Sequence, residues 1–164
     1  MDVVSKWCYN EWPVENADCG LNSEEEYAQD IVDSYINIDK AWPVVLVALL
    51  PSGEPCGTVT LDYGDMSDRP ELSPWLSSLF VPPQFRGHGI GSQLVRFMQE
   101  TVRDLSDVDM LYLWVDLGKK QIGMYQKCGF EEIEQLEYCG NMVAIMKWTA
   151  TEASHGNSPN ASEL

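Results

Sequence analysis

The sequence has little positive charge. Only 10 of its 164 residues are Lys or Arg, against 26 Asp or Glu, which gives a formal net charge of −16. A surface this acidic repels nucleic acid and anionic membranes, so we expect neither as a partner. The same charge would attract cationic substrates or would serve solubility alone, and composition leaves both readings open.

The sequence also lacks any C-x-x-C pair and any long apolar run. Its longest apolar run, residues 44–50, is too short to span a bilayer, and its N-terminus shows no basic region followed by an apolar run that would mark a signal peptide. Its five cysteines predict reduced, mostly buried thiols, no metal site and a cytoplasmic location. They are Cys8, Cys19, Cys56, Cys128 and Cys139.

One segment lacks acidic residues altogether. No Asp or Glu occurs from Leu72 to Gln99, where about four or five would be expected by chance in so acidic a chain. Arg86 and Arg96 lie within this acid-free segment. The sequence therefore predicts that this part of the protein binds a polyanion.

The spacing of apolar residues and turn signals predicts one α/β (α+β) domain over residues 1–148, followed by a disordered tail over residues 149–164. A helix is expected over Val4–Trp12, ended by Pro13, and Ser23 with Glu26 forms a capping box for a second helix. That second helix carries Tyr27, Ile31 and Tyr35 on one face. Two further helices are expected over about 87–105 and 119–128, and strands over about 44–50, 56–61, 72–81, 111–116, 130–138 and 141–148. The inner face expected for the long helix consists of Ile90, Leu94, Phe97, Met98, Thr101 and Leu105.

Three glycines alternate where the long helix begins, at Gly87, Gly89 and Gly91. Without Cβ atoms, the backbone N–H groups can approach a ligand closely. The first N–H groups of a helix also lack internal partners and lie at the positive end of its dipole, which favours an anion. A turn used only for tight packing would not explain the loss of acidic residues around it. The G-x-G-x-G spacing differs from the dinucleotide fingerprint, and the G-K-[ST] of a Walker-type loop is absent.

Residues 86–91, RGHGIG, resemble the R-x-x-G-x-G signature of the GNAT N-acetyltransferase family, and they follow a strand that ends in Leu79-Phe80-Val81 as in that family. Residues 124–130, MYQKCGF, resemble a later motif of the same family. The order of elements from Val44 to Trp148 also follows the family, so the resemblance covers most of the chain.

The resemblance implies a central mixed, mostly antiparallel sheet that is splayed at the acetyl-CoA site and flanked by about four helices. It implies acetyl-CoA as co-substrate and no metal. A β-bulge in the strand that ends at Val81 would open a slot for the pantetheine arm. The arm would meet backbone groups of Leu79, Phe80 and Val81, and the pyrophosphate would lie in a cradle of Arg86, Gly87, His88, Gly89, Ile90, Gly91 and Ser92.

Two departures from the family pattern stand out. Gly118 occupies a place where many relatives have an Asn that touches the cofactor. The sequence begins at the expected first helix, so the usual strand before it is either absent or not included in this sequence. The first departure weakens one expected contact, and the second leaves one sheet edge unexplained.

The reaction implied by the resemblance is direct attack of an amine on the thioester. The ammonium must first lose a proton, and the candidate bases are Asp116, Glu71 and Glu11, although a carboxylate in such a position is more often solvated than a base. Tyr125 would stand near the sulfur and donate a proton to the leaving thiolate, or it would be a core aromatic of a short helix. His88 is expected to contribute its backbone N–H rather than its ring.

Three functions remain in view at this point: an N-acetyltransferase of a small-molecule or peptide amine, an acetyl-CoA sensor with little turnover, and an interaction domain that keeps only the fold. The acidic body favours polyamine, aminoglycoside or basic peptide acceptors. A homodimer is one assembly left open. Four tryptophans could line an acceptor pocket but are expected mainly to fill the core, namely Trp7, Trp12, Trp42 and Trp75.

Overall fold

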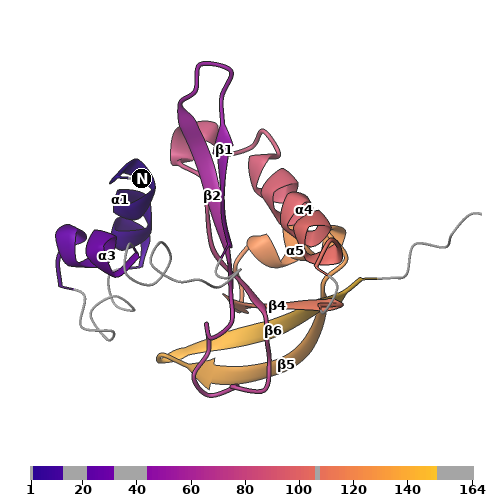
Figure 1. Cartoon of the computed structure of the whole chain (residues 1–164). Coiled ribbons are helices and arrows are strands. Elements are labelled where there is room, and N and C mark those ends of the chain that lie inside the picture. The colour runs from indigo at the N-terminus through magenta and orange to yellow at the C-terminus, as the bar shows by residue number, and fades with distance from the viewer. Residues whose placement is uncertain (1, 13–21, 32–43, 106–107, 151–164) are drawn as a thin grey trace, which may run out of the picture.

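The computed structural model describes residues 2–12, 22–31, 44–105 and 108–150. The expectations for Pro13, Cys19, Tyr35 and Trp42, for the side chain of Ile31 and for the chain beyond Ala150 lie outside this description. In chain order the elements are α1 (Asp2–Glu11), α3 (Glu24–Ile31), β1 (Val44–Leu49), β2 (Pro55–Asp62), β3 (Trp75–Phe80), the 3-10 helix η2 (Pro83–Phe85), α4 (Ile90–Arg103), β4 (Met110–Asp116), α5 (Gln121–Lys127), β5 (Glu131–Tyr138) and β6 (Asn141–Thr149) (Figure 1).

The six strands form one sheet in the order β1-β2-β3-β4-β6-β5. Every neighbouring pair is antiparallel except β3 and β4, which are parallel. The expected mixed, mostly antiparallel sheet is therefore confirmed. Figure 1 shows the hairpin β1–β2 rising away from the hairpin β5–β6. In the strand order, β3 and β4 lie between the two hairpins.

The sheet splits where β3 meets β4. These strands share one register pair, Trp75 with Tyr112, and the Tyr112 N–H donates to Pro74 O at 3.0 Å. Beyond Tyr112 the two strands diverge without further pairing, while β4 keeps its full register with β6 on the other side. The splay expected from the family resemblance is thus present.

A β-bulge lies in β3 on the other side of the split. Thr58 and Thr60 of β2 pair with Phe80 and Ser77 of β3, so β3 uses one more residue than β2 over this stretch. Ser78 takes up the extra length with a φ of +50°, a left-handed conformation uncommon for a residue with a side chain. A bulge bends its strand, which explains why β3 turns away from β4.

Helices cover both faces of the sheet. On one face, Leu94, Val95 and Met98 of α4 pack in the same buried cluster as Leu111 and Leu113 of β4. On the other face, α1 packs against the end of β3, as Figure 1 shows for α1 and α4 on opposite sides of β2. The alternation of side chains along β4 places Tyr112 and Trp114 in a second cluster, on the face away from α4.

The inner face of α4 differs from the expectation. Phe97 is 61% exposed and Thr101 is half-buried, whereas Val95 and Val102 are fully buried. The helix begins at Ile90 rather than Gly87. Gly87 and Gly89 both adopt positive φ, which a right-handed helix does not allow, so the helical backbone can start only after Gly89. The strand expected from residue 72 likewise begins later, at Trp75.

Other local expectations are confirmed with small changes. Ser23 Oγ accepts the Glu26 N–H at 3.1 Å, as in a capping box, but Glu26 Oε2 accepts the N–H of Asn22 at 2.8 Å instead of that of Ser23. Pro82 ends β3, and the short η2 turn that follows it was not predicted. At the other end of the domain, β6 runs to Thr149, and the Ala150 N–H donates to Asp109 O at 2.7 Å.

The described cysteines are mostly buried thiols, as expected. Cys8, Cys56 and Cys128 are buried, and Cys139 is exposed. Burial is the main cause that raises the pKa of the Cys8 thiol to about 11, which keeps it protonated. No helix among the residues described is long and apolar enough to cross a membrane.

Candidate active site

The end of β3 and the glycine loop are held together by Arg86. Its Nε donates to Val81 O at 2.8 Å, and its guanidinium lies 5.8 Å from the centre of the Phe80 ring. The Arg86 N–H donates to Pro83 O at 3.2 Å and closes the η2 turn. Arg86 therefore fixes the course of the loop as well as giving it positive charge.

The glycine loop has the geometry of an anion site. Gly87 and Gly89 adopt φ values of +82° and +80°, and a Cβ on Gly87 would meet nothing within 4 Å, so the loop backbone faces open space. The first bond back along the helix is from the Gln93 N–H to Gly89 O at 3.0 Å. By helix geometry the N–H groups of Ile90, Gly91 and Ser92 precede any intrahelical partner. These donors and the nearby Arg86 suit a pyrophosphate.

The His88 ring turns toward the loop rather than away from it. Its Nδ1 lies 3.3 Å from Phe85 O, and the residue is exposed. The arrangement agrees with the expectation that His88 contributes its backbone N–H, which remains a prediction.

Gly91 is where β3, α4 and α5 converge. A Cβ at Gly91 would lie 3.5 Å from Met124 Sδ on α5 and 3.8 Å from a methyl group of Val81. The structure thus brings together the two motifs that carried the family resemblance, which are separated by more than thirty residues in the sequence. Gly118 has a φ of +85°, and a Cβ there would meet nothing within 4 Å, so this position offers no side chain to a ligand.

Another glycine, Gly57 of β2, was not identified from the sequence and allows α4 to pack closely on the sheet. A Cβ on Gly57 of β2 would lie 2.9 Å from a Leu94 methyl, 3.1 Å from an Ile90 methyl and 3.2 Å from Phe80 O. An isolated glycine in a strand is a sign of close approach, and that signal was available in the apolar run around it. Gly57 thus sets how closely the start of α4 approaches the end of β3.

Tyr125 lies in the core beneath this junction. The residue is buried, and its ring packs edge-on against Phe130 with 5.9 Å between centres. Burial, with a smaller electrostatic effect of Cys128, raises the pKa of the Tyr125 hydroxyl above its ordinary value. The hydroxyl is therefore neutral at physiological pH and can donate a hydrogen bond, but it is unsuited to act as a base.

The three candidate bases are not brought together. Asp116 ends β4 and pairs with Lys119, with 3.5 Å between Oδ2 and Nζ. Glu71 is exposed in the loop between β2 and β3, and Glu11 is exposed at the end of α1. Asp116 lies on β4 beyond the point where it diverges from β3, while the other two lie on separate elements.

A carboxyl group that the sequence did not single out lies near the split. Asp65 Oδ2 accepts a hydrogen bond from Trp114 Nε1 at 2.7 Å. Desolvation is the main cause that raises the pKa of Asp65 to about 7, and the nearby Asp62 raises it further while the Trp114 bond opposes the shift. Nothing in the polar connection around Asp65 signals this environment, because Trp114 is 49 residues away in the chain.

The tryptophans divide between core and the end of β3. Trp75 is fully buried, as expected of a core residue. Trp7 of α1 and Trp12, which directly follows α1, are half-buried, and their rings lie 5.7 Å and 6.5 Å from that of Phe80. Together they cover Phe80 on the side of the sheet away from α4.

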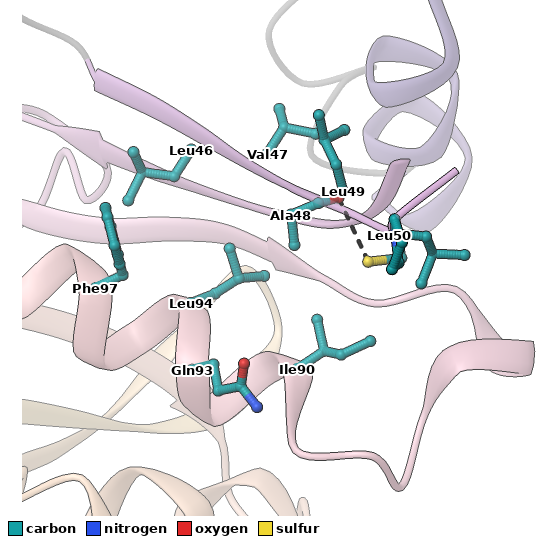
Figure 2. A pocket seen from close by; sticks show the side chains of 11 residues that line it. Leu46, Val47, Ala48, Leu49, Leu50, Ile90, Gln93, Leu94 and Phe97 are labelled. Atoms are coloured by element: carbon teal, nitrogen blue, oxygen red, sulfur yellow. Dashed lines mark hydrogen bonds between the residues drawn. The ribbon is translucent and has the colours of Figure 1, made fainter. Parts of the chain in front are cut away.

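An apolar groove of about 400 Å³ lies between β1 and the first turns of α4 (Figure 2). Figure 2 shows Leu46 and Ala48 turned toward Leu94, with Cys56 Sγ hydrogen-bonded to Ala48 O at 3.4 Å. Of the residues predicted to bind the cofactor, Ile90 alone lines this groove. The groove is therefore separate from the split and the glycine loop. Among the residues described, no group of His, Cys, Asp and Glu is arranged to hold a metal ion.

Comparison with known sequences gives a match to the acetyltransferase (GNAT) family over residues 6–130, most of the chain. Among individual proteins, the thialysine N-epsilon-acetyltransferases of Sus scrofa and Bos taurus are each 26% identical over 98 residues, which cover 57% of this chain and 58% of theirs. The match thus spans little more than half the length of these curated relatives.

Comparison with solved structures gives similar folds. A chimera of the spermidine N-acetyltransferase SpeG from Vibrio cholerae and hSSAT superposes with a TM-score of 0.69 at 20% identity, covering 92% of each chain. A dodecameric spermidine N-acetyltransferase from Vibrio cholerae gives a TM-score of 0.62 at 21% identity, covering 79% of this chain and 75% of that one. At these identities the likeness concerns the fold.

Proposed function

Because the chain belongs to the acetyltransferase (GNAT) family, we propose that it transfers the acetyl group of acetyl-CoA to a primary amine. The observation that carries the proposal is the split between β3 and β4 beside an exposed glycine loop with unpaired helix N–H groups. This combination offers a slot for an extended arm and a cradle for its phosphates.

The residues present suit acetyl-CoA in three respects. The backbone of the loop, together with Arg86, would bind the pyrophosphate, and the acid-free segment removes repulsion from it. Backbone groups of Leu79, Phe80 and Val81 along the diverging strand would bind the pantetheine arm. Bound there, acetyl-CoA supplies an activated thioester. The full proposed cradle is Arg86, Gly87, His88, Gly89, Ile90, Gly91 and Ser92.

Tyr125 would assist the leaving sulfur. Its raised pKa keeps the hydroxyl protonated, so it can donate a hydrogen bond to negative charge that develops on the sulfur as the C–S bond breaks. The acceptor must reach the thioester as a free amine, since an ammonium has no lone pair with which to attack.

We further propose that the acceptor is a cationic small molecule or a basic peptide. The net charge of −16 favours the approach of cations, and the names of relatives point to amines with additional positive charge. The alternative is an acetyl-CoA sensor with little turnover. It would keep the glycine loop but would gain nothing from a protonated Tyr125 near the sulfur.

The test is a screen of acceptors with purified protein and acetyl-CoA, in which release of free CoA thiol is measured. The panel should contain polyamines, aminoglycosides, lysine analogues, basic peptides and matched acidic peptides. We expect turnover with at least one cationic acceptor and none with the acidic peptides. Tight acetyl-CoA binding without thiol release from any acceptor would instead favour the sensor.

A further inference from the structure

The loop between β2 and β3 lies across the sheet face that α4 and α5 leave uncovered. Arg69 of this loop donates from Nε to Glu134 Oε2 on β5 at 3.1 Å and forms an ion pair with the same carboxylate. Met66 is fully buried in one cluster with Trp75 and Tyr112. Met66 and Arg69, which follow Asp65 closely in the chain, therefore fix this part of the loop against the sheet.

These contacts place the Asp65 carboxyl over β4, on the sheet face away from α4. Its hydrogen-bond partner Trp114 follows Tyr112, the residue at which β4 pairs with β3, and lies where the two strands have diverged. The Trp114 ring packs edge-on against Tyr138 of β5 with 5.3 Å between centres. The indole thus orients one carboxylate oxygen, Oδ2, and is itself held in place by a second ring.

Two polar atoms on this face have no partner among the residues that the structure describes. One is Asp65 Oδ1, on a half-buried residue whose carboxyl receives a single hydrogen bond, from Trp114 to Oδ2. The other is Trp75 Nε1, which belongs to a fully buried side chain at the apex of the split. A buried donor without a partner, such as Trp75 Nε1, is normally matched by water or by a ligand, and the half-buried Asp65 Oδ1 has an oxygen free to accept, so this face is suited to receive a polar group.

We propose that Asp65 is the base that takes the proton from the acceptor ammonium, directly or through one water molecule. This inference rests on the proposed acetyltransferase function. The pantetheine arm would enter from the side of α4 and the glycine loop, so the amine must approach the carbonyl carbon from the opposite face, where Asp65 lies.

The protons balance in this scheme. The ammonium transfers one proton to Asp65 and becomes a free amine. Its nitrogen attacks the carbonyl carbon, the new C–N bond forms, the C–S bond breaks, and the second proton lost by the nitrogen ends on the sulfur as a thiol. Asp65 then returns its proton to water. The products are an amide, CoA thiol and one proton.

The surroundings of Asp65 support a base at neutral pH. Asp62 at the end of β2 adds negative charge, while Arg69 in the same loop is already paired with Glu134. On the sheet itself, the Tyr138 hydroxyl is neutral because burial raises its pKa, and the Lys147 ammonium lies over the Tyr112 ring at 5.9 Å from its centre. With its pKa at about 7, Asp65 is better matched to accept a proton than an ordinary carboxylate.

The experiment compares the wild-type protein with Asp65→Asn and with Asp68→Asn, an exposed carboxylate of the same loop. Asn keeps an oxygen that can accept the Trp114 bond. We expect Asp65→Asn to lower kcat/KM about 100-fold at pH 7 and to abolish its rise with pH near 7, with acetyl-CoA affinity unchanged. Asp68→Asn should match the wild type. Measuring the pH profile of kcat/KM with two amines of different pKa distinguishes ionisation of the enzyme from ionisation of the acceptor.

A second readout needs no turnover. Because the folded state holds the Asp65 proton more tightly than the unfolded chain, raising the pH from 5 to 8 should lower the melting temperature of the wild type relative to Asp65→Asn. If Asp65→Asn turns over at the wild-type rate with an unchanged pH profile, the inference about Asp65 is wrong, while the proposed acetyltransferase function stands. Acetyl-CoA binding without wild-type turnover on any amine would overturn the proposed function, and the inference with it.

Discussion

At the scale of single residues, the two side chains named by the family motifs have different surroundings. Arg86 lies at the surface and is bonded to Val81 O, so it combines positive charge with support of the loop. Tyr125 is buried, and burial raises its pKa. Their proposed roles can therefore be tested separately, by removing the Tyr125 hydroxyl and by reversing the charge of Arg86.

Tyr125→Phe should keep the ring packed against Phe130 and leave acetyl-CoA affinity nearly unchanged. Turnover should fall by a factor on the order of 100, because the leaving sulfur loses its hydrogen-bond donor. Steady-state kinetics and calorimetry on the same samples measure both effects. Tyr27→Phe removes a hydroxyl that bonds to Cys8 on the α1 side and serves as the control. Full turnover in Tyr125→Phe would leave Tyr125 as a packing residue.

Arg86→Glu should weaken acetyl-CoA binding far more than Arg103→Glu. Both guanidinium groups lie over an aromatic ring, Arg86 over Phe80 and Arg103 over Trp148 at 5.0 Å, but Arg103 lies at the far end of α4 from the loop. Titration calorimetry of the two variants gives the comparison. Equal losses of affinity would indicate a general effect of charge and contradict a specific loop contact.

At the scale of elements, the position of α4 decides whether the loop and the split form one site. The close approach at Gly57 brings the first turn of α4 against the last residues of β3. The glycine loop spans this short gap with two left-handed residues. Any change that lifts the start of α4 should therefore affect both stability and cofactor binding.

Gly57→Ala should destabilise the protein by about 1–3 kcal/mol, because the added Cβ would lie too close to side chains of α4 and to the backbone oxygen of Phe80. Acetyl-CoA affinity should fall with it. Gly64→Ala is the matched control, since a Cβ there meets nothing within 4 Å. Urea unfolding and calorimetry provide the two measurements. If Gly57→Ala binds acetyl-CoA as tightly as the wild type, the close packing of α4 on β2 does not determine acetyl-CoA affinity.

At the scale of the whole molecule, this acidic protein has one acid-free segment, which we propose binds the polyanionic cofactor. The residues from Leu72 to Gln99 form β3, the glycine loop and most of α4, so the missing negative charge is concentrated around a single junction. The rest of the chain carries all 26 acidic residues. Binding of acetyl-CoA should therefore be local and should stabilise the folded state by mass action.

Acetyl-CoA at a hundredfold excess over its dissociation constant should stabilise the protein by roughly 2–3 kcal/mol. For a chain of this size, that corresponds to a rise in melting temperature of about 5–10 °C. Thermal scans with acetyl-CoA measure this rise. Adenosine, which lacks the pyrophosphate, is the control and should raise the melting temperature only slightly. An unchanged melting temperature at millimolar acetyl-CoA would contradict the proposed site.

The sequence by itself determined the element order, the glycine loop and the likeness to a family, because these depend on local spacing of apolar residues, glycines and short motifs. It also predicted the splay, through the resemblance rather than through any pattern of its own. Phe97 shows the limit of periodicity: it was predicted on the inner face of α4, yet it is exposed, and the sheet beneath α4 buries Val95 and Val102 instead. Only the tertiary structure decided which residues far apart in the chain meet. Asp65 joins Trp114 and Arg69 joins Glu134 because pairing in the sheet and burial of its faces place them together, and neither leaves a trace in local sequence. An isolated glycine such as Gly57 signals a close approach, but only the fold shows that α4 is the element that approaches.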